Sequence, residues 1–235
     1  MNSTIATSEA QAKAKILGFL AGVFRSHPTD ESVRALREMA VELGVACPNG
    51  FSLSELDQEY MDLFVVPTAR YVAPYESVFR DEWPLPAGLR RGSNPAETGG
   101  TVKGLLMGES TIEVRQCYMQ AGLLPEEDLP DHISNELSFL AHLYEREADA
   151  PASEALVIAE LRERFRQEHV AKWIGELRQR VGERDRLGFY RAALEVAEAM
   201  LVEEWDAPVE LDHLPAAPVS PSSGCPFHHG AGGNN

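Results

Sequence analysis

Two short stretches of this sequence combine residue types that recognise ligands or carry protons. The first, APYESVFRD, follows the apolar stretch EYMDLFVVP and contains Pro74, Tyr75, Glu76 and Ser77. Pro74 fixes its own backbone φ and disfavours helix at Ala73, so the chain must turn there. A carboxylate in such a turn can accept hydrogen bonds from backbone N–H groups or pair with a cation. The pattern fits equally well a buried corner in which Tyr75 packs and Glu76 caps the next turn.

The second stretch, PDHISNEL, contains Asp131, His132 and Glu136. Asp131 follows a proline and is placed to N-cap a helix, which would leave His132 in the first turn. An imidazole beside a carboxylate at a helix start is also a suitable recognition pair. His132 and Glu136 are four residues apart, so on a helix their side chains share one face.

The sequence does not assemble a set of catalytic residues. Ser77 lies outside any GxSxG elbow, and Cys117 is expected in mid-helix as a small core residue. The stretch GGTVKGLLMG lacks the spacing of a phosphate-binding P-loop, although weak nucleotide binding stays open. A small metal- or nucleotide-dependent hydrolase is therefore the alternative, and a protein that is not an enzyme is the leading interpretation.

Metal-ligating residues are sparse. The motif CPFHH offers the thiolate of Cys225 and the imidazoles of His228 and His229, which are legitimate zinc ligands. A closed structural site needs four ligands on a rigid scaffold, and this motif has no partner pair nearby. His132 and Glu136 would need at least one further ligand and do not form an HExxH pattern. We therefore expect no metal and no bound cofactor.

Composition and charge limit the classes of partner. The formal net charge of −16 argues against nucleic acid, whose phosphates would be repelled, and suits a cationic partner as well as it suits solubility. No run approaches the roughly 18 apolar residues that span a bilayer, so we expect no stable membrane insertion. The N-terminal stretch does not have the pattern of a signal peptide, and the three cysteines are odd in number and far apart. We expect a cytoplasmic protein.

Apolar periodicity predicts an all-α fold. Helical spacing indicates helices around residues 16–24, 33–43, 53–64, 110–122, 131–148, 151–181 and 187–205. No segment shows a convincing strand alternation. We predict a single compact multi-helix domain over residues 1–207, followed by a disordered Pro/Gly-rich tail over residues 208–235.

Local signals mark helix starts and one long loop. Ser52 with Glu55, and Ser110 with Glu113, fit the capping-box pattern. Residues 84–108 are rich in proline and glycine, and a loop of this length inside a domain is usually functional or mobile. We expect this loop to move when a ligand enters.

The motifs, taken in order, resemble a known family. EYMDLFVVP, APYESVF, QAGLLPEEDLPDHISNELSFLAHL, HVAKWIGELRQRV and FYRAALEVAEAML are similar to the TorD/DmsD/NarJ family of redox-enzyme maturation chaperones, over roughly residues 15–205. PYESVF together with a complete PDHI segment places the sequence closer to the TorD/DmsD branch. The resemblance implies an all-helical cytoplasmic chaperone that binds the twin-arginine signal peptide of a molybdenum-cofactor oxidoreductase. Such a chaperone holds the apoenzyme until its bis-molybdopterin guanine dinucleotide cofactor is inserted, and prevents premature export.

The resemblance also implies a set of binding residues. These residues are Tyr60, Leu63, Phe64, Pro74, Tyr75, Glu76, Ser77, Asp131, His132 and Glu136. A twin-arginine peptide has a dicationic segment followed by an apolar one, so its binder needs carboxylates beside an apolar groove. Glu76 and Asp131 are the expected carboxylates at the edge of that groove, and the aromatic side chains would line its apolar part.

Three points stay open at this stage. The resemblance does not identify the client oxidoreductase, and it leaves the choice between a monomer and a homodimer undecided. A structural helical subunit of a larger complex is a further alternative. It predicts a broad apolar exterior, whereas each helix here has a distinctly polar face.

Overall fold

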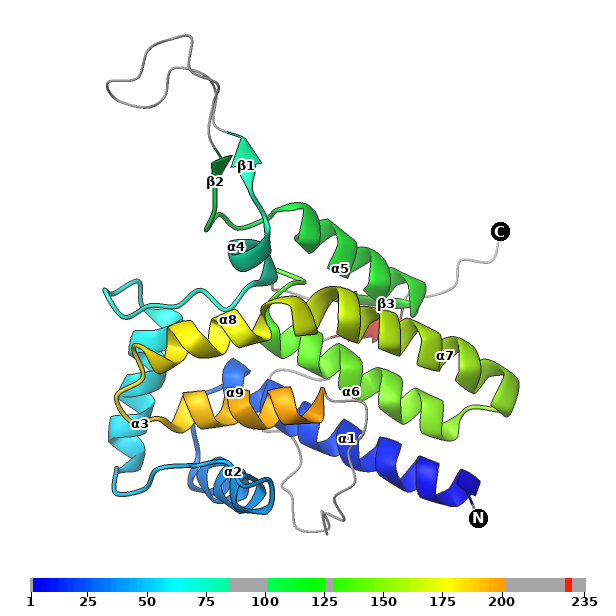
Figure 1. Ribbon diagram of the computed structural model, residues 1–235, viewed down its shortest axis with the longest axis horizontal. Coiled ribbons are helices and arrows are strands. Elements are labelled where there is room, and N and C mark those ends of the chain that lie inside the picture. Colours follow the sequence, from blue (N-terminus) through cyan, green and yellow to red (C-terminus); the bar gives the residue numbers. More distant parts are fainter. Residues whose placement is uncertain (1, 85–100, 126–128, 202–226, 230–235) are drawn as a thin grey trace.

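The protein is built almost entirely from helices, as predicted. The computed structural model describes residues 2–84, 101–125, 129–201 and 227–229. In Figure 1, α6 (Ile133–Asp149) lies between α1 (Asn2–Arg25) and α7 (Ala152–Phe165). On the other side of α1, α9 (Phe189–Met200) packs against α1, α2 (Asp30–Glu42) and α8 (Ala171–Gly182). The all-α fold class is confirmed.

Two of the predicted helices contain π-helical turns. The helix α3 (Leu53–Tyr60) continues into η1 (Met61–Val65) and ends before Pro67. The predicted helix over 151–181 consists of α7, the turn η2 (Arg166–Val170) and α8. Such turns widen a helix locally and occur often at functional sites.

The start of α3 follows the predicted signal, whereas the start of α5 (Glu109–Gln120) does not. The Ser52 side chain accepts from the Glu55 N–H, and Glu55 accepts from the Ser52 N–H, as a capping box requires. At α5 the N-cap is Gly108, and the Ser110 hydroxyl donates to Asp81 Oδ2 instead. The prediction of a capping box at Ser110 was therefore wrong.

Two very short β-ladders accompany the helices. The strand β1 (Trp83–Pro84) follows α4 (Glu76–Arg80) and pairs antiparallel with β2 (Thr101–Val102), and Figure 1 shows this pair projecting beyond α4 and α5. The strand β3 (Leu123–Pro125) pairs antiparallel with β4 (Phe227–His229). Ladders of two or three residues leave the fold class unchanged, because the helices supply the core.

The predicted loop and tail are only partly within the described residues. Residues 85–100 of the loop and the boundary between residues 207 and 208 lie outside them. Of the predicted disordered tail, the structure describes only Phe227–His229, and these three residues form β4. Within the described ranges, no helix combines the length and the apolarity that a bilayer span requires.

One continuous core joins the helices. Its largest fully buried side chains come from α1, α5, α6, α8, α9 and the end of α7, and they include Phe19, Tyr118, Phe139, Phe165, Trp173 and Tyr190. Tyr118, Phe139 and Phe165 form one aromatic group, with ring centroids 4.6 to 6.0 Å apart. Since aromatic side chains bury large areas, this core fixes α5, α6 and α7 around the segment that carries Asp131.

Candidate functional site

The structure joins the two motifs that the sequence singled out. The Glu76 N–H donates to the Asp131 carbonyl at 2.9 Å, and the Ile133 N–H donates to the Pro74 carbonyl at 2.9 Å. These bonds form an isolated antiparallel bridge between Tyr75 and His132. We call the two joined segments, residues 74–77 and 131–136, the motif junction. Two segments more than 50 residues apart in sequence therefore act as one structural unit.

The Asp131 side chain stabilises a different helix from the one predicted. Asp131 Oδ2 accepts from the Ser77 N–H at 3.0 Å, in the first turn of α4. The N-cap of α6 is His132, whose Nδ1 accepts from the Ser134 N–H at 3.1 Å. The prediction that Asp131 N-caps its own helix was therefore wrong. The carboxylate satisfies an N–H group at the start of α4, where an acceptor is most needed.

The carboxyl groups of the motif junction lie inside the protein. Glu76, Ser77, Asp131 and Glu136 are completely buried, and Pro74 is buried as well. The expectation that Glu76 and Asp131 stand at the edge of an open groove is therefore not met in this structure. Of the ten residues taken from the resemblance, only Tyr75 and His132 are partly exposed.

Glu76 is the charged centre of the motif junction. Its carboxylate accepts from Arg80, one turn further along α4, and lies 3.0 Å from Nδ1 of His169. His169 belongs to η2 and is 3% exposed. Burial by itself would lower the pKa of His169, but hydrogen bonds to Cys117 and Glu76 together with their charges raise it to about 9. A buried imidazolium and a part-buried guanidinium therefore balance one buried carboxylate.

Glu136 is a buried acid that keeps its proton. Its Oε2 accepts from the Trp173 indole N–H at 3.0 Å. Burial raises the pKa of the Glu136 carboxyl well above its ordinary value, and the charge of Glu76 and a hydrogen bond to that group add to the effect. Burial and the neighbouring Glu76 charge both favour the neutral form, so Glu136 is the neutral member of this pair of carboxyl groups.

His132 is neutral for a related reason. Burial lowers the pKa of His132 to about 3, and the nearby positive charge of Arg25 contributes. Its ring lies edge-on to Tyr75, with centroids 4.9 Å apart. Tyr75 and His132 therefore present a neutral aromatic pair at the surface, above the buried charges.

Three residues of the predicted binding set lie outside the motif junction. Tyr60, Leu63 and Phe64 are buried where α3 continues into η1. The Phe64 ring contacts Phe24 of α1 and Tyr190 of α9, at centroid distances of 5.9 and 5.1 Å. These residues hold η1 in the core.

The sequence did not single out as site residues three side chains that lie beside the motif junction. Cys117 and Trp173 were expected to be core residues, and His169 was not considered. His169 and Trp173 lie four residues apart across the end of η2 and contact Glu76 and Glu136 respectively. One signal in the sequence could have indicated them. An imidazole and an indole N–H on a buried helix face both need polar partners inside the core.

The metal candidates do not form a site in the described residues. Cys225 lies outside them, and His228 and His229 pair through β4 with Leu124 and Leu123. In the part of the chain that the structure covers, no group of three or more histidine, cysteine, aspartate or glutamate side chains is arranged to hold a metal ion.

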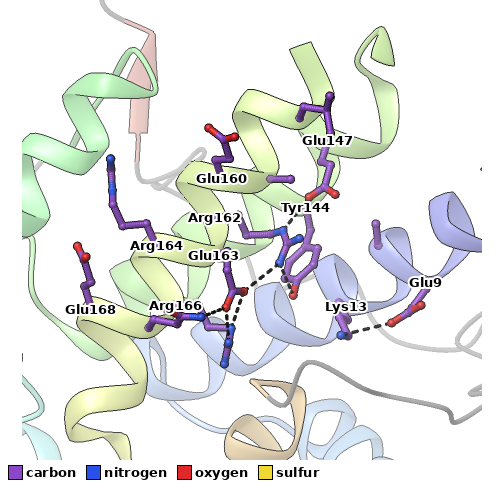
Figure 2. Close-up of a pocket in the computed structure, with 14 residues that line it drawn as sticks. Glu9, Lys13, Tyr144, Glu147, Glu160, Arg162, Glu163, Arg164, Arg166 and Glu168 are labelled. Atoms are coloured by element: carbon purple, nitrogen blue, oxygen red, sulfur yellow. Dashed lines mark hydrogen bonds and ion pairs between the residues drawn. The ribbon is translucent and has the colours of Figure 1, made fainter. Parts of the chain in front are cut away.

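A separate cavity lies away from the motif junction. It has a volume of about 650 Å³ and lies between α1, α6 and α7, with acidic and basic side chains around it (Figure 2). Arg162 donates to Glu147 at 2.7 Å and stacks over the Tyr144 ring, while Lys13 pairs with Glu9. The lining holds five carboxylates and four cationic side chains, and several of them are paired, so the cavity carries little excess charge.

Comparison with known proteins assigns the family. Residues 26–179, more than half of the chain and including both motifs, match the family model described as nitrate reductase delta subunit. The chaperone protein TorD of Shewanella pealeana is 28% identical over 144 residues, which are 60% of this chain and 55% of that protein. The chaperone protein TorD of Vibrio cholerae is 27% identical over 157 residues, 64% of this chain and 60% of that protein. The chain thus spans 55 to 60% of the length of these relatives.

The region of the family match contains every residue of the motif junction. The order of motifs that suggested the TorD/DmsD/NarJ family is therefore supported by an independent comparison over the same region. The chain belongs to the nitrate reductase delta subunit family, and its resemblance to TorD/DmsD/NarJ proteins is confirmed.

Proposed function

We propose that this protein is an assembly chaperone, without turnover of its own, for a molybdenum-cofactor oxidoreductase. It binds the twin-arginine signal peptide and the apo form of that enzyme in the cytoplasm, supports cofactor insertion and prevents premature export. The observation that carries the proposal is the joining of PYES and PDHISNEL into one unit within the matched region. The relatives named chaperone protein TorD support the same class of function.

The geometry divides the proposed binding residues into two groups. Tyr75 and His132 are partly exposed and provide the surface that a peptide contacts. Glu76, Ser77 and Asp131 are buried and hold the two segments together. A rigid corner of this kind reduces the entropy that a binding surface loses when a peptide docks.

Apolar side chains beside α4 suit the hydrophobic part of a signal peptide. Trp83 of β1 is 39% exposed, and Leu105, Leu106 and Met107, which precede α5, are 43 to 65% exposed. Asp81 connects the two segments, since its carboxylate accepts from the Ser110 N–H and hydroxyl. Exposed apolar groups gathered in this way mark interaction sites.

Charge favours a cationic partner at the same end. Glu109 belongs to the segment that follows these apolar residues, Glu82 of the neighbouring segment pairs with Lys103 at 3.2 Å, and the whole chain has a formal net charge of −16. An acidic protein attracts a dicationic peptide from a distance and accelerates encounter, an effect that salt weakens.

Calorimetric titration with a synthetic twin-arginine signal peptide tests the proposal. We expect a dissociation constant of about 1 µM or tighter, equivalent to about −8 kcal/mol. Tyr75→Ala and Trp83→Ala each weaken binding about tenfold, as expected for aromatic contacts. Leu156→Ala is the matched control, because Leu156 is 69% exposed on α7, and this variant binds like the wild type.

Two further measurements complete the test. A peptide with both arginines replaced by alanine binds more weakly, and added salt reduces the difference between the two peptides. The proposal fails if signal peptides from several molybdenum enzymes do not bind, or if Tyr75→Ala and Leu156→Ala behave alike. Light scattering measures the oligomeric state, which the sequence leaves open between a monomer and a homodimer.

A further inference from the structure

A cysteine, a histidine and a glutamate form a continuous polar chain beside the motif junction. Cys117 Sγ, on α5, lies 3.8 Å from Nε2 of His169. The other ring nitrogen of His169, Nδ1, lies 3.0 Å from Glu76 Oε2. A thiol, an imidazole and a carboxylate in this order form the arrangement in which the imidazole takes the thiol proton and the carboxylate orients the ring.

The sulfur lies at the wall of a pocket that carries excess positive charge. This pocket has a volume of about 440 Å³ and is lined by Arg80, Glu113, Gln116, Cys117, Gln120, Arg164, Glu168, His169 and Lys172. With His169 protonated, the lining has four positive groups and two carboxylates, and the buried Glu76, which pairs with Arg80 and His169, is a third carboxylate. The Lys172 side chain is exposed and the Cys117 residue is 8% exposed, so a small reactant can approach the sulfur from the pocket.

We propose that Cys117 is a modification site, a nucleophilic thiolate that hydrogen peroxide and other small hydroperoxides oxidise to a sulfenic acid. The sulfur attacks the terminal peroxide oxygen, an S–O bond forms and the O–O bond breaks. Sulfur is oxidised by two electrons, and the peroxide is reduced. The departing hydroxide, or alkoxide, takes the proton that His169 carries and leaves as water or an alcohol.

The protonation of His169 supports this role. Its pKa is raised to about 9, so at neutral pH it is an imidazolium that donates to Glu76 through Nδ1 and towards Cys117 through Nε2. A thiolate accepts this hydrogen bond better than a thiol does, and cysteines beside an imidazolium are the reactive ones. Cys117 is a core residue in α5, as expected, and it also contacts this imidazole.

Cys47 provides an internal reference in the same molecule. It is partly exposed, more so than Cys117, and burial raises its pKa despite the nearby Arg37. Exposure by itself predicts that Cys47 reacts first. The polar chain predicts the opposite order. Comparing the two cysteines therefore shows whether exposure or the neighbouring imidazole controls the reaction rate.

The first experiment treats the intact protein with hydrogen peroxide in the presence of dimedone, which traps sulfenic acids, and quantifies each cysteine peptide by mass spectrometry. We expect Cys117 to be labelled at least about tenfold faster than Cys47, because the imidazolium of His169 lies beside its sulfur. Equal labelling, or faster labelling of Cys47, overturns the proposal.

The variant His169→Gln tests the mechanism. It retains a polar side chain but cannot become a cation, so the rate at Cys117 falls at least about tenfold while the rate at Cys47 stays constant. The ultraviolet absorbance of a thiolate, measured as the difference between the wild type and Cys117→Ser, disappears in His169→Gln. A Cys117 rate that does not change in a folded His169→Gln protein contradicts the proposal.

Lys172→Glu keeps the test decisive should His169→Gln fail to fold, since Lys172 is exposed at the pocket rim. We expect this variant to lower the ratio of iodoacetate to iodoacetamide reactivity at Cys117 several-fold and to leave that ratio unchanged at Cys47. An unchanged ratio at Cys117 means that the pocket is not the route to the sulfur, and it overturns the proposal.

Discussion

Two groups of buried acids in this protein are neutralised in different ways. The first, which we call the arginine cluster, consists of Glu59, Asp62, Arg70 and Arg186, and it ties α3 and η1 to the segment before α9. The second is the motif junction. Glu59 and Glu76 are both almost completely buried, 1% and 0% exposed.

The arginine cluster is saturated with hydrogen-bond donors. Glu59 accepts from the Arg70 and Arg186 guanidinium groups and from the Arg186 N–H at 2.7 Å, while Asp62 accepts from Arg70 at 2.9 Å. Arg70 also donates to the Arg184 carbonyl at 2.7 Å. Two carboxylates are matched by two guanidinium groups, as a structural ion-pair network requires.

The motif junction has more acid than base. Three carboxyl groups, on Glu76, Asp131 and Glu136, meet Arg80 and His169, and Glu136 is kept neutral by burial and by Glu76. Within the motif junction, the buried atoms Ser77 Oγ, Asp131 Oδ1 and Glu136 Oε1 have no hydrogen-bond partner among the described residues. Groups whose pKa values are displaced in opposite directions gather at functional sites more often than in structural networks. We therefore propose that the arginine cluster serves stability and that the motif junction serves recognition.

The largest effect is expected in the arginine cluster. Arg70→Ala leaves the buried Glu59 carboxylate with Arg186 alone, and removing one partner of a buried ion pair is costly. We expect the free energy of unfolding, measured by urea denaturation, to fall by about 3 kcal/mol. Peptide affinity is unchanged in the folded fraction. A loss of affinity without a loss of stability would reverse the assignment of the two clusters.

Glu76→Gln is the matching change in the motif junction. The amide leaves Arg80 and His169 without a counter-charge, although it still accepts a hydrogen bond. We expect the unfolding free energy to fall by about 2 kcal/mol, the value of a hydrogen bond to a charged group. Unlike Arg70→Ala, this variant also binds the signal peptide more weakly in calorimetry. Unchanged affinity would show that the junction serves only the fold.

The stability of the wild type depends on the neutral state of His132. Its pKa is about 3 in the folded protein and near 6.5 when unfolded, so stability is lost as the pH falls from about 6.5 towards 3. The slope for one proton is about 1.4 kcal/mol per pH unit. His132→Asn replaces the Nδ1 acceptor with an amide oxygen, which also serves as an N-cap, and does not titrate. Urea titrations at several pH values should give a shallower slope for the variant, and parallel slopes would contradict the prediction.

The smallest effect is expected for Glu136→Gln at about pH 5, less than about 1 kcal/mol. The wild-type carboxyl is already protonated there, and the amide oxygen still accepts from Trp173. Because the folded pKa of Glu136 is raised, its contribution is present below the unfolded pKa and is lost as the pH rises. The variant therefore gains stability relative to the wild type between about pH 5 and 7. A variant that loses stability over this range would show that Glu136 is charged.

Local sequence signals were reliable where the chain satisfies its own groups. The capping box at Ser52 formed because both partners lie within one turn of the same helix. The same pattern at Ser110 did not form a capping box. The Asp81 carboxylate lies against the start of α5 and accepts a hydrogen bond from the Ser110 hydroxyl at 2.8 Å. A side chain added at Gly108 would clash with the Asp81 side chain, so glycine at this N-cap lets Asp81 approach the start of α5.

The sequence predicted the members of the motif junction better than their roles. PYES and PDHISNEL correctly indicated the family and its all-helical fold. Whether a carboxylate faces solvent or the core depends on which helices cover it, and no local pattern contains that information. The prediction that Asp131 caps its own helix was wrong for the same reason. The N–H group that Asp131 accepts from belongs to Ser77, 54 residues away in the sequence.

Apolar periodicity by itself determined that this chain is helical, because helix spacing is a local property. The order of the motifs indicated the family. Only the tertiary structure decided that Glu76, Glu136, His169 and Cys117 meet in one buried chain of polar contacts. The physical reason is desolvation. Their protonation states arise from burial and from charges brought by α4, α5, α6 and η2, and these exist only once the helices have packed.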